Sequence, residues 1–131
     1  MRKRTARMNS EFQQIFARLR RILERHASQF KVTADEAGHY CLDVPFSAKF
    51  KKGFPIAWVK VSKGYVSYHF MPVYMFPKLR EGMSAELKGR MQGKSCFNFK
   101  AADEALFKEL EQLTSNGFAL SKQLDADAAI E

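Results

Sequence analysis

Apolar residues recur at helical spacing in the first part of the chain, beginning just after Ser10, which is a candidate N-cap with Gln13 in the capping-box position. The residues of this apolar stripe are Phe12, Ile15, Phe16, Leu19, Ile22 and Leu23. Several arginines lie mostly on the opposite side of the same helix. The pattern predicts an amphipathic helix from residue 10, preceded by a disordered basic arm over residues 1–9.

From residue 30 the pattern changes to short runs typical of β-strands. Residues 30–34 and 39–44 flank a turn-forming Asp-Glu-Ala-Gly segment and predict a hairpin. Residues 56–62 and 65–71 flank Lys63-Gly64 and give the strongest strand signal in the chain. Residues 46–54 mix aromatic residues with lysines, show no clear period and read as an exposed connection.

The last third of the chain alternates short elements with one long helix. Residues 73–76 lie between two prolines and predict either an edge strand or a loop. Ser84 is a candidate cap for a short helix over residues 85–91, and residues 96–99 form a short strand pattern. A final helix begins near Asp103, Asn116-Gly117 could end or kink it, and residues 123–131 are expected to form a frayed acidic tail.

These elements predict an α+β fold in a single domain over residues 10–122. The expected architecture is an antiparallel sheet of about five or six strands. The N- and C-terminal helices each carry one apolar stripe, and the second hairpin offers the only large apolar face for both. We therefore expect both helices to pack on the same face of the sheet.

A two-residue turn at Lys63-Gly64 fixes the register of the second hairpin. It places Trp58 opposite His69 and Lys60 opposite Ser67, on the face that the helices leave free. An aromatic ring beside an imidazole, a cation and a hydroxyl can stack on a flat ligand and hydrogen-bond to it. The candidate ligand-binding residues are Trp58, Lys60, Tyr65, Ser67 and His69.

Composition limits the class of protein. The 131 residues suit one domain, and a hydrophobic fraction of 46% excludes intrinsic disorder for most of the chain. No segment has the length of apolar sequence that a membrane span requires, and the N-terminus lacks the apolar segment of a signal peptide. We expect a cytoplasmic protein with no membrane partner.

The positive charge is concentrated in two parts of the chain. The net charge is +8, with residues 1–31 and 49–100 strongly basic and residues 101–131 acidic. Such a surface attracts polyanions through phosphate neutralisation, so nucleic acid is one possible partner. The candidate contacts are Arg18, Arg21, Arg25, Lys49, Lys51 and Lys52.

Signals for catalysis, metals and cofactors are weak. Cys41 and Cys96 are not in a CxxC pair and are expected to be reduced and packed, and we expect neither a metal site nor a cofactor. The segment 89–95 ends like a phosphate-binding loop but lacks its first glycine and its strand-to-helix context, which leaves only a possible anion site at Lys94 and Ser95. An enzyme hypothesis would depend on His69 alone, so we expect a protein that is not an enzyme.

Two segments and the closing helix carry a family resemblance. The segments are Ala57-Trp-Val-Lys-Val-Ser-Lys-Gly-Tyr-Val-Ser-Tyr-His-Phe-Met-Pro72 and Glu86-Leu-Lys-Gly-Arg-Met-Gln-Gly-Lys-Ser-Cys-Phe-Asn-Phe99. With Leu106 and Leu110, they resemble the YdhG-like domain, a family of small bacterial proteins of unknown function. The resemblance covers about residues 10–120 and implies a frataxin-like fold, and it brings iron handling into consideration because one member has been described as an iron chaperone.

Three functions follow, in order. The first is a non-enzymatic module that binds a small molecule or a protein segment on the Trp58 face. The second is nucleic-acid binding through the basic helix and the loop at residues 49–52. The third is iron handling, which ranks last because frataxin-type iron binding is associated with acidic residues on the first helix, where this chain carries arginines. The ligand and the oligomeric state stay open.

Overall fold

The fold is α+β, with six strands in one antiparallel sheet. The structure is a computed structural model that describes residues 2–44 and 54–130, with side chains described for residues 10–44 and 54–122. The strands lie in the order β1-β2-β3-β4-β6-β5, and their bounds are β1 (Lys31–Glu36), β2 (His39–Val44), β3 (Phe54–Val61), β4 (Val66–Phe70), β5 (Met91–Gln92) and β6 (Cys96–Phe99). The predicted fold class is confirmed.

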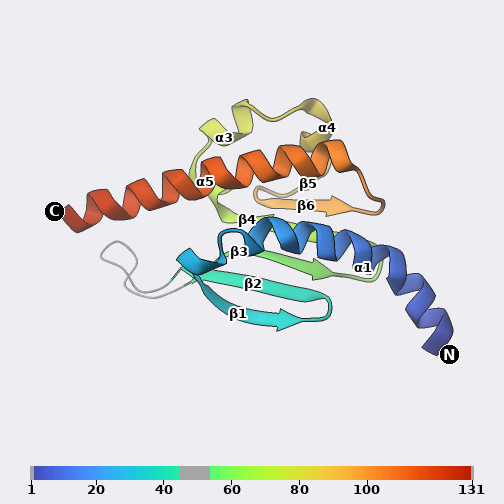
Figure 1. Ribbon diagram of the computed structural model, residues 1–131. Helices are drawn as coiled ribbons and strands as arrows, with labels where there is room; N and C mark the ends of the chain where they lie inside the picture. Colours follow the sequence, from blue (N-terminus) through green and yellow to red (C-terminus); the bar gives the residue numbers. More distant parts are fainter. Residues whose placement is uncertain (1, 45–53, 131) are drawn as a thin grey trace.

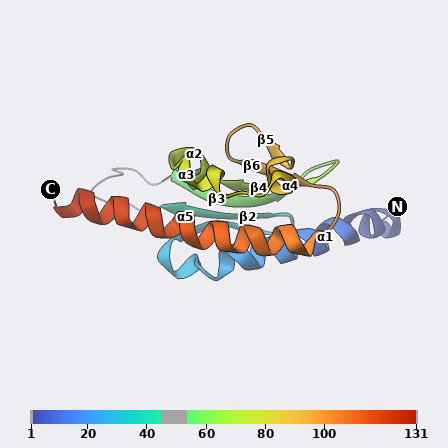
Figure 2. The ribbon, with the colours of Figure 1, turned by 90° about the horizontal axis from the view of Figure 1, so that it is seen from above.

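Two long helices cover one face of this sheet. The helices are α1 (Arg2–Glu24), α2 (Met71–Met75), α3 (Lys78–Glu81), α4 (Ala85–Lys88) and α5 (Glu104–Ile130), with a short 3₁₀ helix η1 (Ala27–Gln29) after α1. α1 and α5 run beside each other across the same side of the strands (Figure 1). The view from above places both helices on one side of the sheet (Figure 2), as the sequence predicted.

The core lies between the two helices and the sheet. Alternation along the strands sends Val59, Tyr68 and Phe97 toward the helices, and all three are fully buried. α1 and α5 contribute the stripes predicted from the sequence, which are Ile15, Phe16, Leu19, Ile22 and Leu23 from α1 and Leu106, Phe107, Leu110, Leu113 and Phe118 from α5. The Tyr68 hydroxyl lies 2.5 Å from Thr114 Oγ1, so the two buried hydroxyls satisfy each other.

Several element boundaries differ from the sequence expectations. α1 begins at Arg2, well before Ser10, and residues 2–9 contain neither glycine nor proline to interrupt a helix. α5 passes through Gly117 and ends only at Ile130. The short helix capped by Ser84 ends at Lys88, and Met91 and Gln92 join the sheet as β5.

The segment between Pro72 and Pro77 also differs from the sequence expectation. It is neither an edge strand nor a loop, because α2 occupies Met71–Met75 with Pro72 in its first turn. A proline is tolerated there because the first backbone N–H groups of a helix have no partner within the helix. None of the helices in the described part of the chain is both long enough and apolar enough to span a membrane.

Leu19 and Leu110 test the shared core. Both side chains are fully buried, one on α1 and one on α5. We expect Leu19→Ala and Leu110→Ala each to lower the free energy of unfolding by about 2–5 kcal/mol, because each leaves a cavity in the same core. Urea denaturation of the two variants would measure this, and a Leu19→Ala variant as stable as the parent would contradict the assigned core.

Gly117 tests the close approach of α5 to the sheet. A Cβ at Gly117 would lie 2.6 Å from two ring atoms of Phe70 and 2.9 Å from Pro72 Cβ. Glycine-to-alanine changes usually stabilise a helix by about 1 kcal/mol. We expect the opposite sign here, a loss of about 1–3 kcal/mol in the free energy of unfolding, because the added methyl group overpacks a rigid site.

Gly82→Ala is the matched control for this change. Nothing lies within 4 Å of a Cβ added at Gly82, and the backbone there has φ −90°, which alanine readily adopts. We expect its free energy of unfolding to stay within about 0.5 kcal/mol of the parent. If Gly117→Ala proved as stable as Gly82→Ala, the close packing of α5 on Phe70 would be refuted.

Candidate functional site

The hairpin register predicted at Lys63-Gly64 is confirmed. β3 and β4 pair so that Trp58 faces His69 and Lys60 faces Ser67. The turn is closed by a hydrogen bond of 2.8 Å from the Ser62 N–H to the Tyr65 carbonyl. Because neighbouring positions on these strands are in the helix-covered core, these four side chains lie on the other side of the sheet.

The neighbouring strands extend this pattern into two rows. Cys41 pairs with Trp58, and Cys96 pairs with His69. In the same way, His39 pairs with Lys60 and Asn98 pairs with Ser67. We call these eight residues the outer face: Cys41, Trp58, His69, Cys96, His39, Lys60, Ser67 and Asn98.

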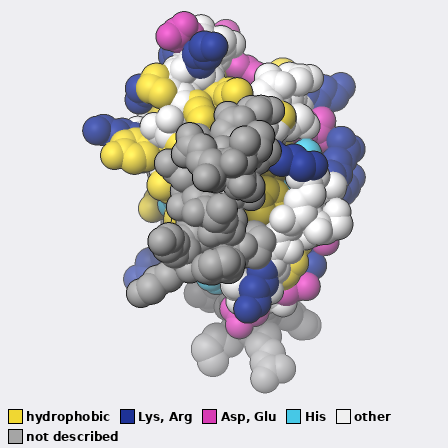
Figure 3. Space-filling view, turned by 90° about the vertical axis from the view of Figure 1, so that its left-hand side faces the viewer, with side chains coloured by type: hydrophobic (Ala, Val, Ile, Leu, Met, Phe, Trp, Pro, Cys, Tyr) yellow, Lys and Arg dark blue, Asp and Glu magenta, His cyan; other side chains and the backbone are white. Residues whose placement is uncertain are grey.

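The outer face is partly open to solvent. Lys60 is exposed, whereas Trp58, His69 and Asn98 are half-buried. Figure 3 views the molecule from the end where α5 finishes and shows hydrophobic side chains at the surface on the side away from α1 and α5. The helices therefore leave this side of the sheet with aromatic and polar groups that a ligand can reach.

Trp58 and His69 form the centre of the outer face. Their rings are nearly parallel, with centroids 4.5 Å apart and planes 10° apart. His69 Nε2 lies 3.0 Å from Ser67 Oγ and 3.7 Å from Cys96 Sγ. Ser67 Oγ in turn donates to the Lys60 carbonyl at 3.3 Å, which leaves its lone pairs to accept from the imidazole N–H. This chain of hydrogen bonds fixes the orientation of the His69 ring.

The environment keeps this cluster uncharged at neutral pH. Burial, followed by the positive charge of Lys60 and the influence of His39, lowers the pKa of His69 to about 4. Burial raises the pKa of the Cys96 thiol and also that of Cys41. Cys96 and His69 are thus a neutral thiol beside a neutral imidazole, unlike the thiolate–imidazolium pair of an activated cysteine nucleophile.

Tyr65 belongs to a different part of the same surface. It lines an open depression of about 480 Å³ together with residues from the α4–β5 connection, β5, β6 and the residue after β6. We call it the basic depression, and its described lining residues are Tyr65, Gly89, Arg90, Gln92, Asn98 and Lys100. Asn98 is shared with the outer face, so the two areas adjoin. The sequence grouped Tyr65 with Trp58 on one face of the hairpin, and the structure adds two cations, Arg90 and Lys100, beside Tyr65.

Lys94 and Ser95, the possible anion site, do not join this depression. Lys94 Nζ lies 5.6 Å from the centre of the exposed Tyr74 ring on α2. The Ser95 carbonyl accepts a hydrogen bond of 2.8 Å from the Phe70 N–H. Gly93, with φ +75°, makes the turn that separates them from Gln92.

Two of the three arginines named as nucleic-acid contacts, Arg18 on α1 and Arg25 just after it, have protein partners. Arg18 forms ion pairs of 2.5 Å with Glu104 and 2.8 Å with Glu111, so it joins α1 to α5. Arg25 lies 4.0 Å from Glu111, whereas Arg21 is exposed and has no ion pair with a described residue. The other named contacts, Lys49, Lys51 and Lys52, lie outside the described residues.

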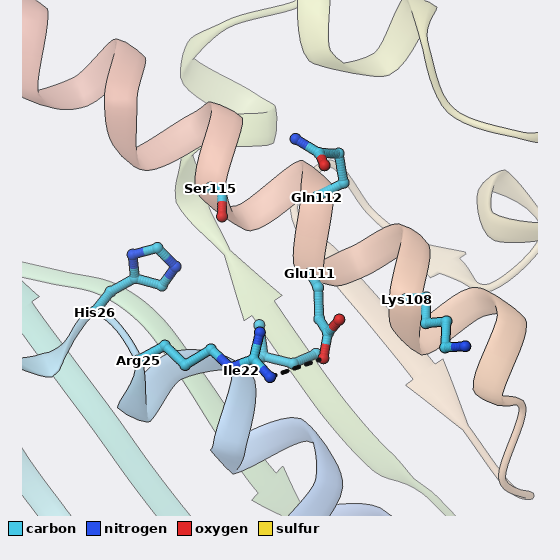
Figure 4. Close-up of a pocket in the computed structure, with 7 residues that line it drawn as sticks. All are labelled: Ile22, Arg25, His26, Lys108, Glu111, Gln112 and Ser115. Atoms are coloured by element: carbon cyan, nitrogen blue, oxygen red, sulfur yellow. Dashed lines mark ion pairs between the residues drawn. The ribbon is translucent and has the colours of Figure 1, made fainter.

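A small groove follows the line between α1 and α5 (Figure 4). It has a volume of about 190 Å³, and the Arg25–Glu111 ion pair crosses it. Its described lining residues are Ile22, Arg25, His26, Lys108, Glu111, Gln112 and Ser115. Because its charges already pair across the helices, we interpret this groove as part of the helix–helix joint.

The described side chains also limit where a metal ion could bind. Within residues 2–44 and 54–130, no three His, Cys, Asp or Glu side chains come together in a way that could hold a metal ion. The two described cysteines are free thiols, and Cys41 is buried.

Comparison with known proteins adds no assignment. The chain has no significant match among protein-family models, curated proteins or solved structures.

The pKa of His69 is the most direct test of this site. We expect the His69 ring to stay neutral until the pH approaches about 4. The unfolded chain binds this proton at about pH 6.5, so the contribution of His69 makes the protein less stable as the pH falls from 6.5 toward 4. NMR titration of the imidazole protons would measure the pKa directly.

Lys60→Ala provides the comparison for that titration. Removing the neighbouring cation should raise the pKa of His69 toward its ordinary value, because Lys60 is among the groups that lower it. A His69 pKa near 6.5 in the parent protein, unchanged by Lys60→Ala, would refute the described environment.

Proposed function

We propose that the protein is a non-enzymatic binding module whose outer face takes up a small molecule with a planar ring. The observation that supports this most is the Trp58–His69 ring pair, held parallel on the sheet face that α1 and α5 do not cover. The pair is uncharged at neutral pH and half-buried, so its desolvation by a flat ligand costs little. Aromatic surfaces of this kind bind planar groups by stacking.

Polar groups around the ring pair would orient such a ligand. Lys60 supplies a cation from the next row, and Asn98 supplies a side-chain amide. Both lie within one strand spacing of Ser67, whose hydroxyl is held by the Lys60 carbonyl and His69. An apolar surface with a few fixed polar groups is the usual composition of a small-molecule site.

The chemistry of the cluster favours binding over catalysis. A nucleophile needs a thiolate or an activated hydroxyl, whereas burial keeps the Cys96 thiol protonated. Ser67 is itself almost fully buried. A complete catalytic set combines a nucleophile with a base, an acidic group that orients the base, and an open approach for the substrate. Neither the Cys96 thiol nor the Ser67 hydroxyl has this combination.

The two other functions rank below this one. The basic-helix route to nucleic acid is weakened because Arg18 and Arg25 are already paired with Glu104 and Glu111. Iron handling would need a group of oxygen ligands, and the described residues contain no group of three metal-ligating side chains. A protein segment on the outer face is an alternative outcome of the test that follows.

Trp58 is the only tryptophan in the chain, so its fluorescence reports on the outer face alone. We expect a panel of small molecules with planar rings to contain at least one that changes the Trp58 emission and shifts the NMR signals of Trp58 and His69. Trp58→Ala should weaken the binding of that molecule by roughly tenfold, because it removes the stacking surface.

Tyr74→Ala is the matched control, since Tyr74 is 52% exposed on α2 and is not part of the outer face. Its affinity for the same molecule should equal that of the parent. If every responding ligand bound equally well to Trp58→Ala, or if the signals moved only in other parts of the protein, the proposed function would be rejected. Response to peptides alone would replace the small molecule by a protein segment.

A further inference from the structure

Many lysines and arginines without an ion pair to a described acid lie around the β3–β4 and β5–β6 hairpins. Every ion pair among the described residues is made by an arginine between residues 18 and 25. The described lysines and arginines from residue 60 to residue 100 form none with described acids. These unpaired cations belong to the strongly basic middle of the sequence, whereas Arg18 and Arg20 on α1 are paired with acids.

The basic depression gathers two of these unpaired cations. Arg90, just before β5, and Lys100, just after β6, line it from the open end of the β5–β6 hairpin, and none of its described lining residues is acidic. The side chains of Arg90, Gln92 and Lys100 and the hydroxyl of Tyr65 make no hydrogen bond with any described residue. Their donors are therefore available to a ligand.

The backbone around these side chains is fixed. The Asn98 N–H donates to the Arg90 carbonyl at 2.9 Å, and Gln92 pairs with Cys96 in the sheet. Asn98 is itself paired with Ser67 on β4. The depression is built on paired strands, which keeps its donors in a constant arrangement.

These features define the chemistry of a ligand. Two cations in a described lining that holds no acidic residue favour a group with more than one negative charge, and an arginine fork matches phosphate oxygens. The Tyr65 ring offers a surface for a flat group, and a volume of about 480 Å³ accommodates a molecule the size of a nucleotide. We infer that the basic depression binds a nucleotide unit, with the phosphate on Arg90 and Lys100 and the base against Tyr65.

This inference concerns a different part of the surface from the Trp58–His69 pair, although Asn98 touches both. The same chemistry is offered by a free nucleotide and by one residue of a single-stranded nucleic acid, because both carry a phosphate and an unpaired base. The two sources differ in length, and the experiment separates them by that difference.

The experiment is an NMR titration of the full chain at low salt with four probes. They are adenosine, adenosine 5′-monophosphate, inorganic phosphate and a short single-stranded oligodeoxyadenylate. We expect adenosine 5′-monophosphate to shift the signals of Tyr65, Arg90 and Asn98, with adenosine binding much more weakly. Added salt should weaken the binding, since the phosphate contacts are electrostatic.

Charge-matched variants assign the effect to the depression. Arg90→Gln and Lys100→Gln should each weaken binding of the monophosphate by about tenfold, because each removes a charge-assisted hydrogen bond. Lys31→Gln removes the same charge from β1, at the other edge of the sheet from β5, and should leave the affinity unchanged. The folded state of each variant is checked by its NMR spectrum before titration.

The titrations distinguish a free nucleotide from nucleic acid, and they can also show that neither binds in the basic depression. Tighter binding of the oligonucleotide than of the monophosphate, with the same variant effects, would identify nucleic acid as the source, and the reverse would identify a free nucleotide. Equal binding of adenosine and its monophosphate, or equal losses in Lys31→Gln and Arg90→Gln, would overturn it. Shifts confined to Trp58 and His69 would also overturn it while leaving the proposed function intact.

Discussion

The structure depends on burying the apolar stripes of α1 and α5 against one face of a single sheet. Val59, Tyr68 and Phe97 stand in adjacent strands on that face, and both helices pack over it. Since side chains alternate between the faces of a strand, burial of these three residues directs their neighbours to the other side. The position of Trp58, His69 and Asn98 on an open surface is thus a consequence of core formation.

The same packing determines which basic side chains form ion pairs and which do not. The acids of α5 come to lie against the arginines of α1, so Arg18 is paired with Glu104 and Glu111. This joins the two helices and cancels charge that the sequence alone would assign to a polyanion surface. None of the described residues that line the basic depression with Arg90 and Lys100 is acidic, which favours a positive potential there.

The sequence predicted the parts of this arrangement that follow from local pattern. Helical spacing from Phe12 to Leu23 gave the α1 stripe, and a two-residue turn at Lys63-Gly64 gave the β3–β4 register. The pairing of β4 with β6 joins strands that are separated by three short helices, and no local pattern reports it. For that reason the sequence did not place Asn98 and Cys96 on the outer face, and it did not bring Arg90 and Lys100 beside Tyr65. The partners of Arg18 could not be predicted either, because Glu104 and Glu111 come from α5, some ninety residues later.

The central claim is that one side of the sheet is covered by helices and the other is available to ligands. Solvent paramagnetic relaxation by a soluble gadolinium chelate measures this directly, because it broadens proton signals according to their exposure. Side-chain protons of Trp58, Lys60 and Asn98 should be broadened strongly, while those of Val59, Tyr68 and Phe97, on the same strands, should be protected. Equal protection of both sets would show that the outer face is covered, and it would contradict the account.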